Sequence, residues 1–236
     1  MLSNIHTSWR EILQSSLESL DREYLHFLKD DSSYFPDKNN LFNAFKTLPL
    51  EDTKYILFGQ DPYPRFESAL GYAFIDGKVE SLFSKDGGFS KEVNKATSLR
   101  NMMKMLLLCE GELKDDFSKE AIKKIDSSKY INSIIELKNN FEKNGVLLLN
   151  SALIFTRKED SKYHAKMWKS FVDTLLKGVK DRDIKLLLFG NISKEIDKLN
   201  SSKDFEKVLV PHPYNVSFIT DKKVLEVFYP MKLLEK

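Results

Sequence analysis

The sequence has a single cysteine and four scattered histidines among its 236 residues. One thiol cannot form an intramolecular disulfide, so Cys109, which lies in an apolar run, is expected to be a small buried core residue in a reducing compartment. Clusters of Cys and His at the spacing of zinc ligands are absent, so a structural zinc site is not expected. We expect the protein to need no metal or other cofactor.

Long apolar runs and a large excess of one charge are also missing. No stretch reaches the roughly 18 to 20 apolar residues that a membrane span needs, and the N-terminus lacks the pattern of a secretion signal. These features predict a cytoplasmic or nuclear protein without a membrane partner. The formal charge is only +2, from 37 basic and 35 acidic residues. Any affinity for an anionic polymer must therefore come from the local arrangement of charges.

What the sequence does contain is a set of four short runs rich in Leu, Ile and Val. They lie at residues 55–58, 146–149, 185–189 and 208–210. Continuous apolar runs without alternation are typical of strands in a parallel sheet that is covered on both faces. Segments with helical spacing lie around them, at residues 8–20, 98–111, 130–145, 164–181 and 221–236, and Pro230 is expected to kink or end the last one.

This order of elements predicts an α/β fold. We expect a single domain over residues 1–236, with a short four-stranded parallel sheet flanked by helices. Residues 111–129 are mostly charged, and they are expected to form either a solvated helix or a mobile surface connection.

Polar residues follow the predicted strands, at the edge where open parallel sheets bind ligands. They are Gln60 and Asp61, then Asn150, then Asn191 after Gly190, and finally His212. Each alone has a plain structural explanation, such as a turn, a helix cap or a buried imidazole. Together they favour one crevice with a carboxylate for water, an amide that donates and accepts, and an imidazole for a developing anion. A flat heterocycle fits this set, and the rings of Tyr63 and Phe74 would wall it.

Several well-known catalytic motifs are absent. The chain lacks the G-x-S-x-G motif of a nucleophilic serine, the G-x-G-x-x-G motif of a dinucleotide site and the G-x-x-x-x-G-K-[ST] motif of a P-loop. A small-molecule α/β hydrolase is therefore disfavoured.

A series of short motifs runs nearly end to end: "GQDPYP", "LGYAF", "SLRNMMK", "GVLLLNSAL", "MWKSFVD", "LLLFGN" and "VPHP". In these motifs the sequence resembles the family 1 uracil-DNA glycosylases, whose first signature is GQDPYH and whose last is HPSPLS. The resemblance implies a monofunctional, metal-free hydrolase that cleaves the N-glycosidic bond of uracil in DNA, releases free uracil and leaves an abasic site. It also implies a monomer that extrudes the base from single- or double-stranded DNA. A proteinaceous inhibitor or a replication partner is left open.

The resemblance also implies a role for each residue of the base pocket. Asp61 matches the catalytic acid that orients the attacking water and favours the cationic sugar. His212 matches the histidine that hydrogen-bonds uracil O2, and Asn150 matches the side chain that reads O4 and N3–H. Gln60 would contribute a backbone N–H at O2, Tyr63 would block a methyl group at C5, and Phe74 would stack on the base.

The same resemblance implies a set of DNA-contacting positions: Pro64, Ser98, His164, Gly190, Asn191, Tyr214, Val216 and Ser217. Several of them depart from the family pattern. Pro64 replaces a histidine that helps to arrange water and phosphate, Val216 replaces the leucine that wedges into the base stack, and the segment before Ser98 lacks the usual prolines. We therefore predict that uracil specificity is retained, with a stronger preference for single strands.

Two alternatives stay open, and the first is motivated by these departures. The first is a catalytically weakened DNA-binding or processivity protein on the same fold. The presence of both Asp61 and His212 argues against it. The second is a glycosylase with altered or broadened base choice. The presence of Tyr63 and Asn150 argues against it.

Overall fold

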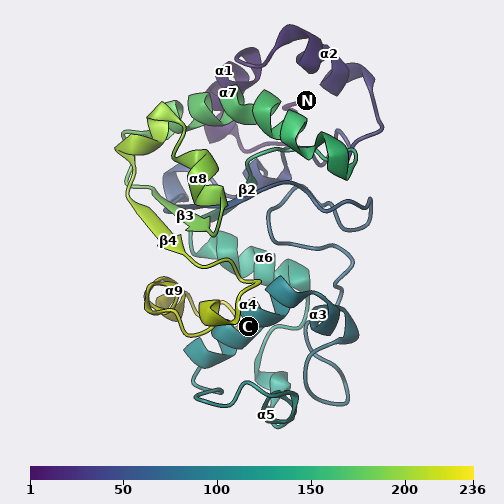
Figure 1. Ribbon diagram of the computed structural model, residues 1–236, viewed down its shortest axis with the longest axis vertical. Coiled ribbons are helices and arrows are strands. Elements are labelled where there is room, and N and C mark those ends of the chain that lie inside the picture. Colours follow the sequence, from purple (N-terminus) through teal and green to yellow (C-terminus); the bar gives the residue numbers. More distant parts are fainter. The chain divides into compact units, whose positions relative to one another are not determined.

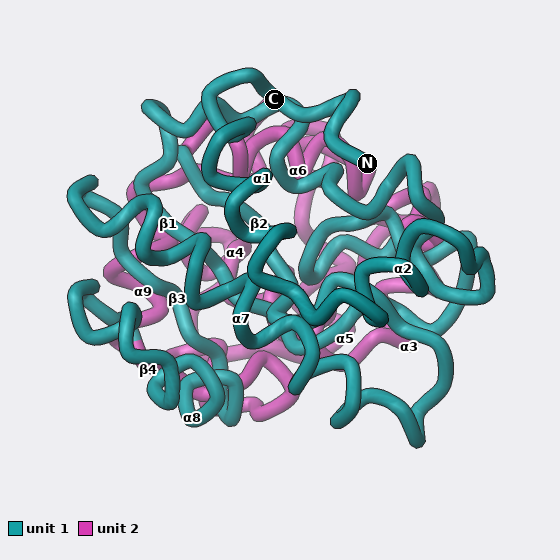
Figure 2. The backbone as a smooth tube through the Cα atoms, turned by 90° about the horizontal axis from the view of Figure 1, so that it is seen from above, with its two compact units in different colours: residues 1–76, 145–208 teal, residues 77–144, 209–236 magenta.

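The computed structural model describes all 236 residues and divides the chain into two compact units (Figure 2). Unit 1 comprises Met1–Asp76 and Gly145–Val208, and unit 2 comprises Gly77–Asn144 and Leu209–Lys236. Each unit therefore consists of two separate segments of the chain. The expectation of a single domain over residues 1–236 stays a prediction.

A four-stranded sheet carries the residues predicted to form the site. Its strands are β1 Tyr55–Gly59, β2 Val146–Asn150, β3 Lys185–Phe189 and β4 Lys207–Val210, in the order β2-β1-β3-β4. β1 pairs in parallel with both β2 and β3, and this register places Gly59 beside Asn150. The predicted α/β class and four-stranded parallel sheet are confirmed, with every strand boundary within one residue of its predicted position.

Helices α1 (Arg10–Glu18) and α7 (Ser161–Val179) share a hydrophobic core with one face of the sheet in unit 1 (Figure 1). Alternate strand residues point into this core, among them Ile56 and Phe58, which join Trp168 and Phe171 of α7. The intervening strand residues Leu57, Leu148 and Leu187 are buried as well. Burial of both sets explains why the strands read as continuous apolar runs.

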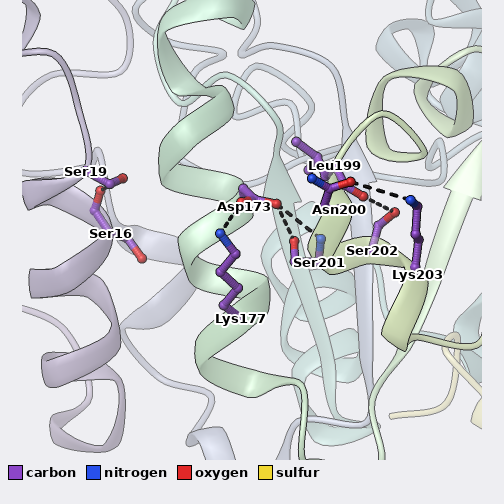
Figure 3. A network of polar contacts seen from close by, with 9 residues as sticks. All are labelled: Ser16, Ser19, Asp173, Lys177, Leu199, Asn200, Ser201, Ser202 and Lys203. Atoms are coloured by element: carbon purple, nitrogen blue, oxygen red, sulfur yellow. Dashed lines mark hydrogen bonds and ion pairs between the residues drawn. The ribbon is translucent and has the colours of Figure 1, made fainter.

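Unit 1 has two further α-helices, α2 (Arg22–Asp30) and α8 (Ile192–Ile196). A polar clamp ties the 3₁₀ segment Asn200–Asp204, which precedes β4, to α7 (Figure 3). Asp173 Oδ1 accepts hydrogen bonds from the Ser201 backbone N–H over 3.2 Å and from its hydroxyl over 2.7 Å, while Lys177 Nζ lies 2.7 Å from Asp173 Oδ2. The clamp fixes the segment by which the chain returns from α8 to β4.

Unit 2 is built mainly from helices. They are α3 (Lys91–Lys95), α4 (Thr97–Cys109), α5 (Lys119–Lys123), α6 (Ile134–Lys143) and α9 (Lys222–Phe228). Cys109 is buried, as predicted, and α9 stops at Phe228, immediately before the 3₁₀ turn that contains Pro230. Residues 111–129 contain α5 and a 3₁₀ turn at Ser127–Lys129. None of the helices is long and apolar enough to cross a membrane.

Candidate active site

The side chain of Asn150 is held against the backbone of Gly59, where β1 and β2 end side by side. A Cβ atom built on Gly59 would lie 2.3 Å from Asn150 Oδ1 and 2.9 Å from the Cβ of Ala73, closer than real Cβ atoms come. Only glycine leaves room for the amide in this position. The Ser151 backbone N–H donates to the Gly59 carbonyl over 2.9 Å, so the two strand ends are also joined beyond the sheet.

The Gln60 carbonyl makes a second link between the strand ends. It accepts from the Ala152 backbone N–H over 3.0 Å and from the Ser151 hydroxyl over 2.9 Å. Because the Gln60 carbonyl oxygen is bonded to the residues that follow β2, the backbone that leads into Asp61 is held in a defined orientation.

Asp61 is partly buried directly after this link. Burial raises the pKa of its carboxyl group, and hydrogen bonds from the Ser161 side chain and from the Asp61 backbone oppose that effect. Ser161 is the first residue of α7, a 19-residue helix whose N-terminus favours negative charge. The carboxylate is therefore partly removed from water but kept in place by hydrogen bonds. In such a setting it can orient or deprotonate a water molecule.

Two aromatic residues of the predicted base pocket lie in the segment after β1. Phe74 has φ 64, a left-handed conformation that is rare for an aromatic residue and is often found at functional sites. Its ring centroid lies 5.4 Å from that of Phe189, the last residue of β3, at an interplanar angle of 59°. Burial, with the charge of Asp76, raises the pKa of Tyr63, which keeps its phenol neutral.

A groove of about 560 Å³ adjoins the strand ends in unit 1. The strand-end residues Gln60, Ser151 and Asn191 line it together with α7 and α8. Lys162, Lys166 and Lys169 lie along the α7 side at positions i, i+4 and i+7, on one helix face, and none of them forms a salt bridge. A row of unpaired lysines is a feature of surfaces that bind a phosphodiester backbone.

His212 belongs to unit 2, and a hydrogen bond from the backbone sets the tautomer of its ring. Its Nδ1 atom accepts a hydrogen bond from the Tyr214 backbone N–H over 3.0 Å. A neutral imidazole that accepts at Nδ1 carries its proton on Nε2, where it is a donor. Burial lowers the pKa of His212, which favours this neutral donor form near pH 7.

Asn101 is a residue that sequence reasoning missed. It lies in α4, is 3% exposed, and its Nδ2 donates to the carbonyls of Pro213 over 2.8 Å and Tyr214 over 3.4 Å. Asn101 thereby holds the loop that follows His212. Its signal in the sequence is a lone amide among the apolar residues of "SLRNMMKMLLLC".

The other predicted DNA-contacting residues fall in different settings. Tyr214 and Val216 are exposed, at 67% and 72%, and Ser217 lies beside them in the 3₁₀ segment Val216–Phe218. Ser98 is the second residue of α4, Pro64 is exposed, and Gly190 and Asn191 follow β3. Their contacts with DNA stay predictions.

His164 is a buried histidine whose two ring nitrogens are both engaged. Nδ1 lies 2.8 Å from the Tyr24 hydroxyl, and Nε2 lies 2.9 Å from the Thr156 hydroxyl. Burial also lowers its pKa. The predicted contact of His164 with a DNA backbone stays a prediction, because its present partners explain its position without one.

An acid and an amide at neighbouring strand ends of a parallel α/β sheet are the arrangement expected of a DNA glycosylase. A uracil-DNA glycosylase from Fusobacterium nucleatum is 29% identical over 228 residues, which are 92% of this chain and 84% of that protein. The crystal structure of wild-type UNG from Nitratifractor salsuginis has 46% identity and a TM-score of 0.96, covering 99% of this chain and 94% of that one. The chain belongs to the uracil-DNA glycosylase family.

Two further comparisons mark the limits of the likeness. A mimivirus UNG in complex with UGI shares only the fold, with 18% identity and a TM-score of 0.58, over 90% of this chain and 71% of that one. No family model matches the chain.

Proposed function

We propose that the protein excises uracil from DNA, by hydrolysing the N-glycosidic bond so that free uracil and an abasic site are formed. The observation that carries this proposal is the pairing of a fixed amide, Asn150, with a desolvated carboxylate, Asp61, at neighbouring strand ends. The first can read a base edge, and the second can act on the water that replaces the base.

The bond-breaking step would use Asp61 and His212. As the bond to the base lengthens, positive charge grows on the sugar and negative charge on the base. The Asp61 carboxylate favours the first charge and orients the water, while the Nε2–H of neutral His212 donates to uracil O2. Removing one such preorganised donor typically slows a reaction by about 10²- to 10³-fold.

Base selection would depend on the fixed amide of Asn150. Uracil presents an acceptor at O4 and a donor at N3, and cytosine reverses this pattern. Since the Asn150 side chain is buried and lies close against Gly59, it cannot turn freely to suit cytosine. A site that leaves buried polar groups unpaired can reject the wrong partner by roughly 10⁴-fold. The Tyr63 ring would exclude the methyl group of thymine.

Binding of the DNA strand would be sequence-independent and electrostatic. The unpaired lysines Lys162, Lys166 and Lys169 support a path for the phosphates along the α7 groove. The smaller Val216 side chain supports a preference for single-stranded over duplex DNA. We further propose that the protein acts as a monomer in the compartment that holds the DNA.

The test is release of free uracil from a uracil-containing oligonucleotide in a chelating buffer, with single-stranded and duplex substrates compared. Wild type is expected to release uracil, with the higher rate on single strands. Asp61→Asn is expected to lose the activity, while the matched control Asp183→Asn, at an exposed acid, keeps it. If wild type releases no uracil and Asp61→Asn binds DNA as wild type does, the protein is a DNA-binding protein and not a glycosylase.

A further inference from the structure

Unit 2 contains a second basic concave surface, here named the basic hollow, with a volume of about 580 Å³. Helices α3 and α5 line it together with the loop that precedes α3. Its charged lining residues are Lys91 and Lys95 of α3, Lys119 and Lys123 of α5, and the single acid Asp86. α5 belongs to the charged segment 111–129, for which the base pocket provides no role.

The spacing of the four lysines places each pair on one helix face. Lys91 and Lys95 are four residues apart, as are Lys119 and Lys123, and residues at i and i+4 are neighbours on a helix surface. None of the four forms a salt bridge. Like charges gathered without partners repel one another, and an anionic ligand would relieve that repulsion.

The two short helices are held in place by local hydrogen bonds. Ser90 caps α3 by accepting from the Val93 N–H over 3.2 Å, and Ser118 caps α5 by accepting from the Ala121 N–H over 3.1 Å. Asn94 Nδ2 donates to the Phe89 carbonyl over 3.0 Å, which ties the loop to α3. The lysine pairs are therefore carried by a fixed frame.

The same loop comes close to α5. Gly87 has φ 85, and a Cβ atom built on it would lie 3.1 Å from the Lys123 carbonyl oxygen. The frame of the hollow is thus closed on both sides, from the loop to α3 and from the loop to α5.

We propose that the basic hollow binds the phosphodiester backbone of the DNA substrate at nucleotides outside the one being excised. This proposal rests on the proposed function. α3 ends at Lys95, and Ser98, a predicted phosphate contact, follows three residues later in α4. A strand whose phosphate lies at Ser98 would therefore lie close to the lysines of α3. Lysines that act as point charges extend the footprint on DNA without adding sequence preference.

The test compares two variants that each remove four positive charges. The first carries Lys91→Gln, Lys95→Gln, Lys119→Gln and Lys123→Gln. The matched control carries Lys46→Gln, Lys114→Gln, Lys143→Gln and Lys180→Gln, at exposed lysines that line none of these surfaces and form no salt bridge. Uracil release is measured on single strands of about 5 and about 30 nucleotides, since single-strand sites span roughly 4 to 16 nucleotides.

We expect the hollow variant to raise KM on the long substrate by roughly tenfold at low salt and to leave the short substrate unchanged. If two phosphate contacts are lost, the slope of log kcat/KM against log salt becomes shallower by about 1.4. The control variant should behave as wild type, and replacing the same four lysines with arginine should preserve KM.

Two results would overturn the proposal. One is a hollow variant with the wild-type KM and salt slope on the long substrate. The other is that wild type binds inorganic phosphate saturably and the hollow variant does not, while the KM of the hollow variant on DNA stays unchanged. That result would assign the hollow to a free anion. If wild type releases no uracil at all, the proposed function fails. The hollow is then tested separately, by fluorescence anisotropy with an unmodified long strand, and equal affinities of the two variants would refute it.

Discussion

Replacing Gly59 with alanine tests whether the position of the Asn150 amide is what makes the site work. The new Cβ atom would lie 2.3 Å from Asn150 Oδ1, whereas real Cβ contacts essentially never fall below 3.0 Å and ordinary contacts begin at 3.4 Å. The amide must therefore retreat by about 0.7 to 1.1 Å. A displacement of about 1 Å can cost 10²-fold in rate, so we expect kcat/KM for uracil release to fall by about 100-fold. The free energy of unfolding should fall by about 1 to 3 kcal/mol, the usual cost of overpacking.

A double-mutant cycle with Asn150→Ala separates this effect from a general disturbance of the sheet. Because Gly59→Ala acts through the Asn150 side chain, it should add little to the loss in rate once that side chain is gone. A small effect on stability should remain, from the contact with the Cβ of Ala73 at 2.9 Å. The measurements are kcat/KM on a uracil oligonucleotide and the midpoint of urea unfolding. A Gly59→Ala enzyme within about twofold of wild type, or fully additive losses in rate, would refute the reasoning.

Three further predictions concern other parts of the site. Burial raises the pKa of Asp61, so its charge destabilises the fold at neutral pH and this cost disappears as pH falls below the folded pKa. Asp61→Asn should therefore slow uracil release by roughly 10³-fold or more and yet raise Tm at pH 7. The gain in Tm should shrink toward pH 4, and an unchanged or lower Tm at pH 7 would contradict this. Asn101→Ala removes the hydrogen-bond donor to the loop after His212. It should lower the free energy of unfolding, measured in urea, by about 1 to 3 kcal/mol and should also lower kcat. An unaffected kcat would separate that loop from catalysis. Val216→Leu should raise the duplex rate relative to the single-strand rate, and an unchanged ratio in paired assays would exclude a wedging role for this exposed position.

The sheet and its polar edge were predictable because they depend on short-range patterns. The runs that became β1, β2, β3 and β4 are apolar without alternation, so their strand character and burial could be read from composition alone. The placement of Asp61 and Asn150 at one edge of the sheet followed from the rule that parallel strands end at the same edge, whereas the pairing of Gly59 with Asn150 required the structure.

Features that depend on the detailed backbone conformation or on distant partners were not predictable. The tautomer of His212 is set by the conformation that brings the Tyr214 backbone N–H to its ring. The buried amide of Asn101 has its nearer partner, the Pro213 carbonyl, 112 residues further along the chain. The left-handed backbone of Phe74 is also invisible in the sequence, because nothing in the letters "GYAF" marks a positive φ at an aromatic residue. Helix α2 was missed, although Asp21 caps it, because its residues 22–30 are more polar than those of the other long helices.

The division of each unit into two chain segments bears on how the protein folds during synthesis. β1 is flanked in the sheet by β2 and β3, and these strands begin only at Val146 and Lys185. On the ribosome, the apolar strand Tyr55–Gly59 therefore emerges long before either neighbour exists, with both of its hydrogen-bonding edges open. Such long-range pairing slows folding and leaves a nascent strand open to aggregation. The strand that leads to Asp61 is thus a segment of the nascent chain that stays unpaired until most of the protein has been made.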